Sequence, residues 1–147
     1  VPDRLKDGPK PDMVPELGAT YVTSLEDLPE PPDIVITAPG IGQLVFDVIG
    51  RTAPDAIVCL TGISSGTRDL SLAADAVNKG MVLANEVVFG SVNAGLANYT
   101  QAADALAKAD NDWLAKLITR TVPMADWAQA LKREPDDIKV VVDLQAD

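Results

Sequence analysis

Three short segments of this 147-residue chain follow apolar runs and carry the small and polar residues that suit a flat ligand. They are residues 37–40 (TAPG), 61–65 (TGISS) and 90–93 (GSVN). Glycine lets a ligand come close to the backbone because it has no side chain. Serine, threonine and asparagine offer hydrogen-bond donors and acceptors to a sugar or an amide. One such segment is uninformative, since strands commonly end in glycine and serine, but three in consecutive units predict a crevice for a nucleotide.

The chain lacks the residue types on which much hydrolytic and metal chemistry depends. It contains no histidine and a single cysteine, Cys59. A Ser–His or Cys–His nucleophile pair and a zinc site built from cysteine and histidine are therefore excluded within these residues. We expect no catalytic residue and no metal ligand in the chain. One cysteine forms no intrachain disulfide, which fits a reducing, cytoplasmic compartment.

The charge balance narrows the classes of partner. Twelve lysines and arginines against 22 aspartates and glutamates give a net charge of −10. An acidic surface repels phosphate backbones and anionic lipids, so we expect neither nucleic acid nor a membrane as a partner. Apolar residues make up 47% and charged residues 23% of the chain, which is the mix of a soluble globular protein.

The elements that must position the three segments follow from the hydrophobic pattern. Short apolar runs predict strands at residues 19–23, 33–37, 56–60, 87–90 and 138–144. Helical spacing and capping signals predict helices at residues 43–51, 70–79, 96–109, 112–119 and 124–133. This alternation predicts an α/β fold with a largely parallel sheet, in which the run 33–37 is buried on both faces. Ligands of such sheets bind at the carboxyl ends of the strands, where the three segments lie.

A glycine-rich phosphate-binding turn is not found. Gly40 and Gly42 follow a strand and open a helix, but Val45 stands where a dinucleotide fingerprint needs its third glycine. The next strand ends in residues 59–62 (CLTG), which offer no charged side chain to a ribose. The fingerprint therefore fails at both positions.

Several longer segments resemble a known family. Residues 16–22 (ELGATYV) look like the segment that follows the second strand of the nucleotide domain in medium-chain dehydrogenases. Residues 81–85 (MVLAN) and 88–93 (VFGSVN) are similar to a characteristic stretch of the zinc-dependent glucose dehydrogenases of that superfamily. The similarity continues through Trp113 to the strand at 138–144 and so covers nearly the whole chain.

The resemblance implies a partial Rossmann-like, doubly wound and mostly parallel sheet that lacks its first strands. The whole chain, residues 1–147, would form one domain: the C-terminal part of an NAD(P)-binding domain plus a C-terminal strand. The N-terminal catalytic domain, with its zinc ligands, would lie outside the chain. In the family's strand order the run 19–23 is third and the run 33–37 fourth, so these two would not be neighbours.

The resemblance also assigns contacts to three parts of the cofactor: the 2′-phosphate, the length of the dinucleotide and the nicotinamide end. Arg4 and Lys6 fall where basic residues face the 2′-phosphate of NADP, and a solvated basic patch is the alternative. Ala38 and Gly40 would lie along the cofactor, although Pro39 between them removes one backbone donor.

The remaining contacts gather at the nicotinamide end. Thr61, Gly62 and Ile63 match an element that lies against the nicotinamide amide. Ser91, Val92 and Asn93 would touch the nicotinamide end, and the Asn93 side chain would also bind a sugar hydroxyl of the substrate. The alternative for this segment is a strand-to-helix turn in which Asn93 is the helix N-cap.

The implied activity is oxidation of an aldose at C1 to the lactone, with a hydride passing to NADP or NAD. D-glucose is the aldose that the resemblance favours. Zinc would act only from the domain outside the chain, so the chain alone is expected to be inactive. Oligomerisation through this domain would make the protein a homo-oligomer. The alternatives are a non-catalytic nucleotide-binding or oligomerisation module, and a medium-chain dehydrogenase that acts on another polyol or alcohol.

Overall fold

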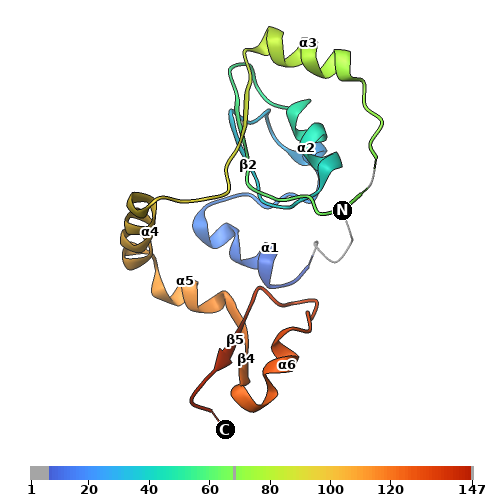
Figure 1. Ribbon diagram of the computed structural model, residues 1–147. Helices are drawn as coiled ribbons and strands as arrows, with labels where there is room; N and C mark the ends of the chain where they lie inside the picture. The colour runs from blue at the N-terminus through green and yellow to red at the C-terminus, as the bar shows by residue number, and fades with distance from the viewer. Residues whose placement is uncertain (1–6, 68, 147) are drawn as a thin grey trace. The chain divides into compact units, whose positions relative to one another are not determined.

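The computed structural model describes residues 7–67 and 69–146 (Figure 1). The chain divides into two compact units. One is the continuous stretch Ser24–Ala94, and the other joins the segments before and after it. Each unit contains a small sheet of its own, and every strand pair in the described residues is parallel. Parallel strands alternating with helices confirm the predicted α/β class.

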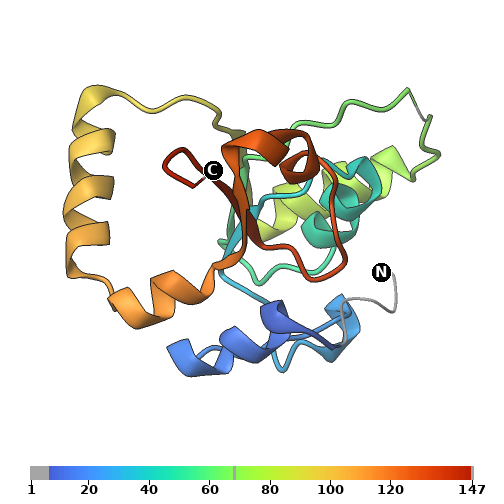
Figure 2. The same ribbon diagram turned by 90° about the horizontal axis from the view of Figure 1, so that it is seen from below.

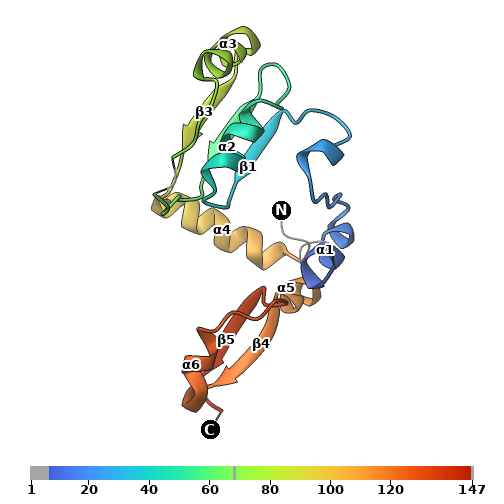
Figure 3. The same cartoon turned by 90° about the vertical axis from the view of Figure 1, so that its right-hand side faces the viewer.

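The unit Ser24–Ala94 is built on a three-stranded sheet (Figure 3). Its strands are β1 (Ile34–Thr37), β2 (Ile57–Leu60) and β3 (Val87–Gly90), in the order β1-β2-β3. Helices α2 (Gly42–Ile49) and α3 (Ala74–Ala84) make the two crossover connections, and the 3-10 turn η3 (Leu25–Asp27) precedes β1. The buried core of this unit is formed by Val48, Ile49, Ala56 and Val58. The strands agree with the predicted ones to within a residue or two.

The prediction that residues 33–37 are buried on both faces is wrong for this chain. Ile34 and Ile36, which point to one face of β1, are 69% and 68% exposed. The opposite face carries Thr37, which is buried, and Val35, which is half-buried. The two crossovers run in the same direction along the sheet, and right-handed crossovers place both of their helices on one face. The other face therefore has no helix from this unit to cover it.

The strand predicted at residues 19–23 does not form. Its residues are irregular, and no strand within the described residues pairs with them. A strand needs a neighbour to satisfy its backbone groups, which propensity alone does not provide. The short helix α1 (Pro9–Met13) and the 3-10 turn η2 (Pro15–Leu17) precede these residues. This turn ends at Gly18, whose φ of 73° is the left-handed conformation that glycine adopts without strain.

The second unit combines consecutive helices with a two-stranded sheet. Figure 2 shows α4 (Leu96–Lys108, gold) turning into α5 (Asn111–Lys116, orange). The strands β4 (Ile118–Pro123) and β5 (Lys139–Asp143) pair in parallel, with a register irregularity between Ile118 and Arg120. Between them lie the 3-10 turn η4 (Met124–Asp126) and the short helix α6 (Trp127–Ala130).

Two of the predicted helices in this region are shorter than expected. The helix predicted at 112–119 ends at Lys116, because the β-branched run that follows enters β4, a strand that was not predicted. Its N-cap is Asp110, whose carboxylate accepts hydrogen bonds from the backbone N–H groups of Asp112 and Trp113. The helix predicted at 124–133 is reduced to η4 and α6. The predicted strand at 138–144 forms as β5.

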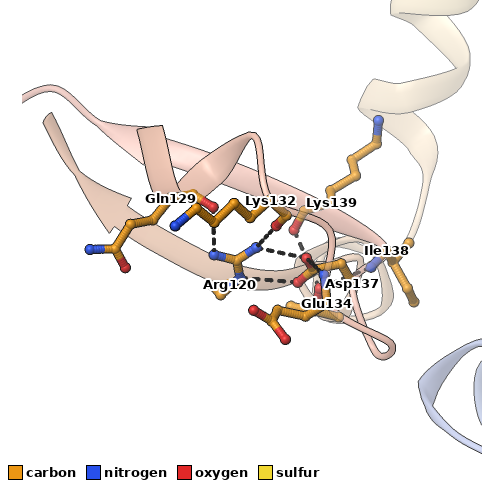
Figure 4. A network of polar contacts seen from close by, with 8 residues as sticks. Arg120, Gln129, Lys132, Glu134, Asp137, Ile138 and Lys139 are labelled. Atoms are coloured by element: carbon orange, nitrogen blue, oxygen red, sulfur yellow. Dashed lines mark hydrogen bonds and ion pairs between the residues drawn. The ribbon is translucent and has the colours of Figure 1, made fainter. Parts of the chain in front are cut away.

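A polar network holds α6 and the turn after it against β4 (Figure 4). The Arg120 guanidinium donates from Nε to Asp137 Oδ1 at 3.1 Å and from Nη2 to Oδ2 at 2.7 Å. The same guanidinium donates to the backbone carbonyls of Gln129 at 3.2 Å and Lys132 at 2.8 Å. The Asp137 carboxylate also accepts from the backbone N–H of Glu134 at 2.8 Å. One arginine therefore binds the end of α6 and the turn before β5 at the same time.

This network predicts a specific loss of stability in acid. Arg120 and then the Glu134 N–H lower the pKa of Asp137 from 3.8 to about 2. A carboxylate whose pKa is lowered by folding stabilises the folded state above its unfolded pKa, about 3.9, and this contribution is lost as the pH falls towards about 2. The urea midpoint, followed by the fluorescence of Trp113 and Trp127 in this unit, should fall over that range in the unchanged protein and less steeply in Asp137→Asn.

Asp136→Asn is the matched control for this titration. Asp136 is the adjacent residue and is exposed, and its side chain makes none of the hydrogen bonds found in the described part of the chain. Asp136→Asn should keep the full acid dependence of the unchanged protein. An equally steep fall in Asp137→Asn would contradict the role given to the Arg120–Asp137 pair.

Candidate functional site

The parallel register brings the ends of β1, β2 and β3 to one edge of the sheet. Thr37 is aligned with Leu60, and Leu60 with Gly90. The segments that follow, residues 38–40, 61–63 and 91–93, therefore leave the sheet side by side. All eight predicted site residues of these segments lie within the unit Ser24–Ala94: Ala38, Gly40, Thr61, Gly62, Ile63, Ser91, Val92 and Asn93.

Backbone hydrogen bonds tie these ends together. The Thr37 carbonyl accepts from the backbone N–H groups of Thr61 and Gly62, both at 3.0 Å, and from the Thr61 hydroxyl at 3.0 Å. The Leu60 carbonyl accepts from the Ser91 N–H at 2.9 Å. Each strand end is thus attached to the next one along the sheet, which limits how far any of the three segments can move alone.

The two glycines of the site bring backbone against backbone. A Cβ atom added at Gly62 would lie 2.5 Å from the carbonyl oxygens of Ala38 and Pro39. A Cβ atom added at Gly40 would overlap the Ile63 carbonyl. Their small size is therefore needed for contact between the turns after β1 and β2. The expectation that it also makes room for a ligand stays a prediction.

Several side chains of the site face solvent. Ile63 and Val92 are 75% and 73% exposed, and Ser91 and Asn93 are exposed as well. Within the described residues no side chain or backbone group hydrogen-bonds to the Asn93 amide. The alternative that Asn93 caps the next helix is wrong: that helix begins at Leu96 after the N-cap Gly95.

An open hollow lies beside the strand ends, at the N-terminus of α2. Its volume is about 470 Å³. It is lined by residues of the α2 start and of the loop after β2: Gly40, Ile41, Gly42, Gln43, Ser64, Gly66, Thr67 and Leu70. The first backbone N–H groups of α2 point out of the N-terminal end of the helix, where the hollow lies. The side chain of the N-cap residue, Ile41, has no acceptor for them. Sequence reasoning missed Gln43, Ser64 and Thr67, although Ser64 belongs to a segment that it singled out.

Two predicted site residues lie outside the described part of the chain, and two kinds of feature are absent within it. Arg4 and Lys6 lie outside the described residues. In residues 7–67 and 69–146 no group of three or more histidine, cysteine, aspartate or glutamate side chains is arranged to hold a metal ion. Over the same residues no helix is both long enough and apolar enough to cross a membrane.

Parallel strands in sequential order, joined by two helical crossovers and with three polar ends at one edge, define a parallel α/β unit of the βαβαβ type. Residues 1–144 match the sequence model of the family described as "Glucose dehydrogenase C-terminus", and the chain belongs to that family. The resemblance inferred from residues 81–93 is confirmed by this match.

Curated relatives and solved structures agree with the family assignment. The glucose 1-dehydrogenase of Thermoproteus tenax is 36% identical over 153 residues, which cover 99% of this chain and 43% of that protein. The glucose 1-dehydrogenase of Methanocella arvoryzae is 32% identical over 130 residues, covering 86% and 36%. A structure of Haloferax mediterranei glucose dehydrogenase in complex with NADP, Zn and gluconolactone matches with a TM-score of 0.85 and 26% identity, covering 97% of this chain and 42% of that one. The chain thus spans about two fifths of the length of these relatives.

Proposed function

We propose that this chain is the cofactor-binding, C-terminal portion of a glucose 1-dehydrogenase that uses NADP or NAD. The observation that carries the proposal is the alignment of three polar strand ends at one sheet edge, in a chain that matches the glucose dehydrogenase family over residues 1–144. The relative from Haloferax mediterranei was solved with NADP, Zn and gluconolactone, which are the cofactor, the metal and the product of such a reaction. Sugar oxidation at C1 is therefore the reaction that we assign to the complete enzyme.

The strand ends suit the nicotinamide end of the cofactor. When bound here, the cofactor would supply the acceptor for the hydride that leaves C1 of the sugar, as the C1 hydroxyl loses its proton and the lactone forms. Thr61, Gly62 and Ile63 would lie against the nicotinamide amide, and Ala38 and Gly40 along the dinucleotide. The three linked segments would hold the ring in one orientation, which is one of the contributions that a protein makes to hydride transfer.

The third segment would connect the cofactor to the sugar. Ser91 and Val92 would contact the nicotinamide end, while the exposed Asn93 amide, which is unpaired within the described residues, is free to bind a sugar hydroxyl. An amide offers both a donor and an acceptor, as a pair of neighbouring hydroxyls requires. Asn93 would thereby orient C1 of the sugar towards the nicotinamide.

The metal does not fit the described residues of this chain. No group of potential ligands is arranged for it there, and the chain contains no histidine. We assign zinc, and the group that accepts the hydroxyl proton, to the part of the family's proteins that this chain does not span. On this proposal the 147-residue chain by itself is inactive. We also propose that the complete enzyme is a cytoplasmic homo-oligomer.

Removal of the Asn93 amide tests this assignment in the complete enzyme. Asn93→Ala should lower kcat/KM for glucose by about tenfold to a hundredfold, as expected when one or two hydrogen bonds to the reacting sugar are lost. The affinity for NADP should change much less. Initial rates of NADPH formation at varied glucose and varied NADP separate the two effects.

Asn78→Ala is the matched control, because Asn78 is exposed on α3 and lies outside the three segments. It should leave both kinetic constants unchanged. An Asn93→Ala enzyme with the unchanged kcat/KM for glucose would remove Asn93 from the sugar site. Zinc-dependent glucose oxidation by the 147-residue chain alone would contradict the assignment of zinc and the proton acceptor to a part of the enzyme outside this chain.

A further inference from the structure

The contacts of Gly40 and Gly62 are reciprocal. A Cβ atom at Gly62 would meet the backbone of Ala38 and Pro39, in the turn after β1. A Cβ atom at Gly40 would meet the Ile63 carbonyl and come within 3.0 Å of the Ser64 nitrogen, in the turn after β2. Each glycine therefore makes room for the backbone of the other turn. The atoms in the way are backbone atoms, which cannot rotate aside as a flexible side chain can.

Backbone conformation does not explain why these positions are glycine. Among the described residues, glycines with a positive φ are Gly8 and Gly18, so Gly40 and Gly62 have φ values that any residue adopts. The steric contact alone requires the absence of a side chain. This separates the pair from Gly80 in α3, where an added Cβ would have no neighbour within 4 Å.

Two further features make the contact between the turns rigid. The Thr37 carbonyl binds the N–H groups of Thr61 and Gly62 and the Thr61 hydroxyl, which attaches the second turn to the last residue of β1. Pro39 fixes its own φ inside the first turn, so that turn has fewer ways to yield. The three hydrogen bonds to the Thr37 carbonyl and the two glycine contacts together restrict how far the backbone at Gly62 and Ile63 can move.

We propose that Gly40 and Gly62 are positioning residues of the cofactor site, which lock the turns after β1 and β2 into one backbone clasp and so set where Ile63 and Ser64 leave the sheet. This inference rests on the proposed function. Ile63 is 75% exposed immediately after the clasp, and Ser64 lines the hollow beside α2. Displacement of a bound group by about 1 Å is enough to cost a hundredfold in rate, so a clasp of this kind matters even where the glycines touch no ligand.

Amide hydrogen exchange of the isotopically labelled chain, measured by NMR without and then with NADP, tests the clasp. In Gly62→Ala and Gly40→Ala the amides of Thr61 and Gly62 (or the residue replacing it) should exchange at least about tenfold faster without ligand, because their bonds to the Thr37 carbonyl are strained. NADP-induced shifts at Ile63 and Ser64 should then need at least about tenfold more NADP. Gly80→Ala is the control and should change neither quantity.

Thr61→Val serves if an alanine variant fails to fold. It removes the hydroxyl bond to the Thr37 carbonyl and leaves both glycines in place. The Gly62 amide should then exchange about fivefold faster, as expected for one lost hydrogen bond, and the NADP titration should shift in the same direction.

The possible results are distinguishable. Unchanged exchange in the folded variants would overturn the clasp. Faster exchange with an unchanged NADP titration would overturn the positioning role and leave a purely structural contact. If the unchanged chain shows no NADP-induced shift at any strand end, the proposed cofactor site fails and the positioning role fails with it, while the exchange rates still decide whether the two turns are locked.

Discussion

Replacement of Val58 by aspartate is expected to unfold the unit Ser24–Ala94. Val58 lies in the middle strand of the sheet, is aligned with Val35 and Val88 on the neighbouring strands, and is fully buried. Both of its register neighbours are valines, so the carboxylate would be buried between apolar side chains. Leaving a charge buried without a partner costs several kcal/mol, about as much as the whole stability of a small unit. Thermal melting by far-UV circular dichroism, with mapping of protease cleavage sites, would detect the loss.

Val82→Asp is the matched control for this substitution. Val82 is 66% exposed on α3, so the same change of side chain buries no charge there. A small loss is expected, because an acid near the C-terminal end of a helix is unfavourable by about 0.3–1 kcal/mol. A Val58→Asp chain that melts like the unchanged protein, without new cleavage between residues 24 and 94, would show that Val58 is not the centre of a core.

Among substitutions that remove a positive charge from the second unit, Arg120→Ala is expected to lower the stability most. It removes hydrogen bonds to both oxygens of the Asp137 carboxylate and to two backbone carbonyls at the end of α6. Asp137 is only 9% exposed and would be left with the Glu134 N–H as its remaining partner in the network. We expect the Tm to fall by about 5 °C or more in Arg120→Ala. Fluorescence of Trp127, which begins α6, reports the change directly.

Two further variants separate geometry from charge. Arg120→Lys keeps the charge but cannot reproduce a planar fork that reaches four acceptors, so it should recover only a minor part of the lost stability. Lys132→Ala removes the same charge nearby, but the network uses only the backbone carbonyl of Lys132, so its Tm should stay close to that of the unchanged protein. Equal losses in Arg120→Ala and Lys132→Ala would reduce the network to a general charge effect.

The strands of the first unit could be predicted because their signal is local. The runs ending at Thr37, Leu60 and Gly90 are short, apolar and rich in β-branched residues, and each is closed by glycine or a polar residue. Because these runs alternate with helices, the pattern predicts a parallel sheet. In a parallel sheet the carboxyl ends of the strands lie at the same edge. The position of the candidate site followed from this topology without knowledge of any side-chain contact.

Features that depend on a neighbour could not be predicted in the same way. Residues 19–23 have strand propensity, but no strand of the described chain lies beside them to form a sheet. Ile34 and Ile36 look like buried residues, yet their burial depends on what covers that face of the sheet. The helix predicted at 112–119 includes the first two residues of β4, because the helical pattern before Lys116 extends into them. The role of Gly40 and Gly62 became visible only when the two turns were seen in contact.

The parallel arrangement of every described strand pair also has a kinetic consequence. Paired residues such as Ile34 and Ile57, Ile57 and Val87, or Ile118 and Lys139 are 23, 30 and 21 residues apart in the sequence. No hairpin is available among them to nucleate a sheet, so loop-closure entropy must be overcome before any interstrand hydrogen bond can compensate for it. During refolding the nascent strands remain unpaired for longer than in a β-meander, and it is in this interval that the chain is most prone to aggregate.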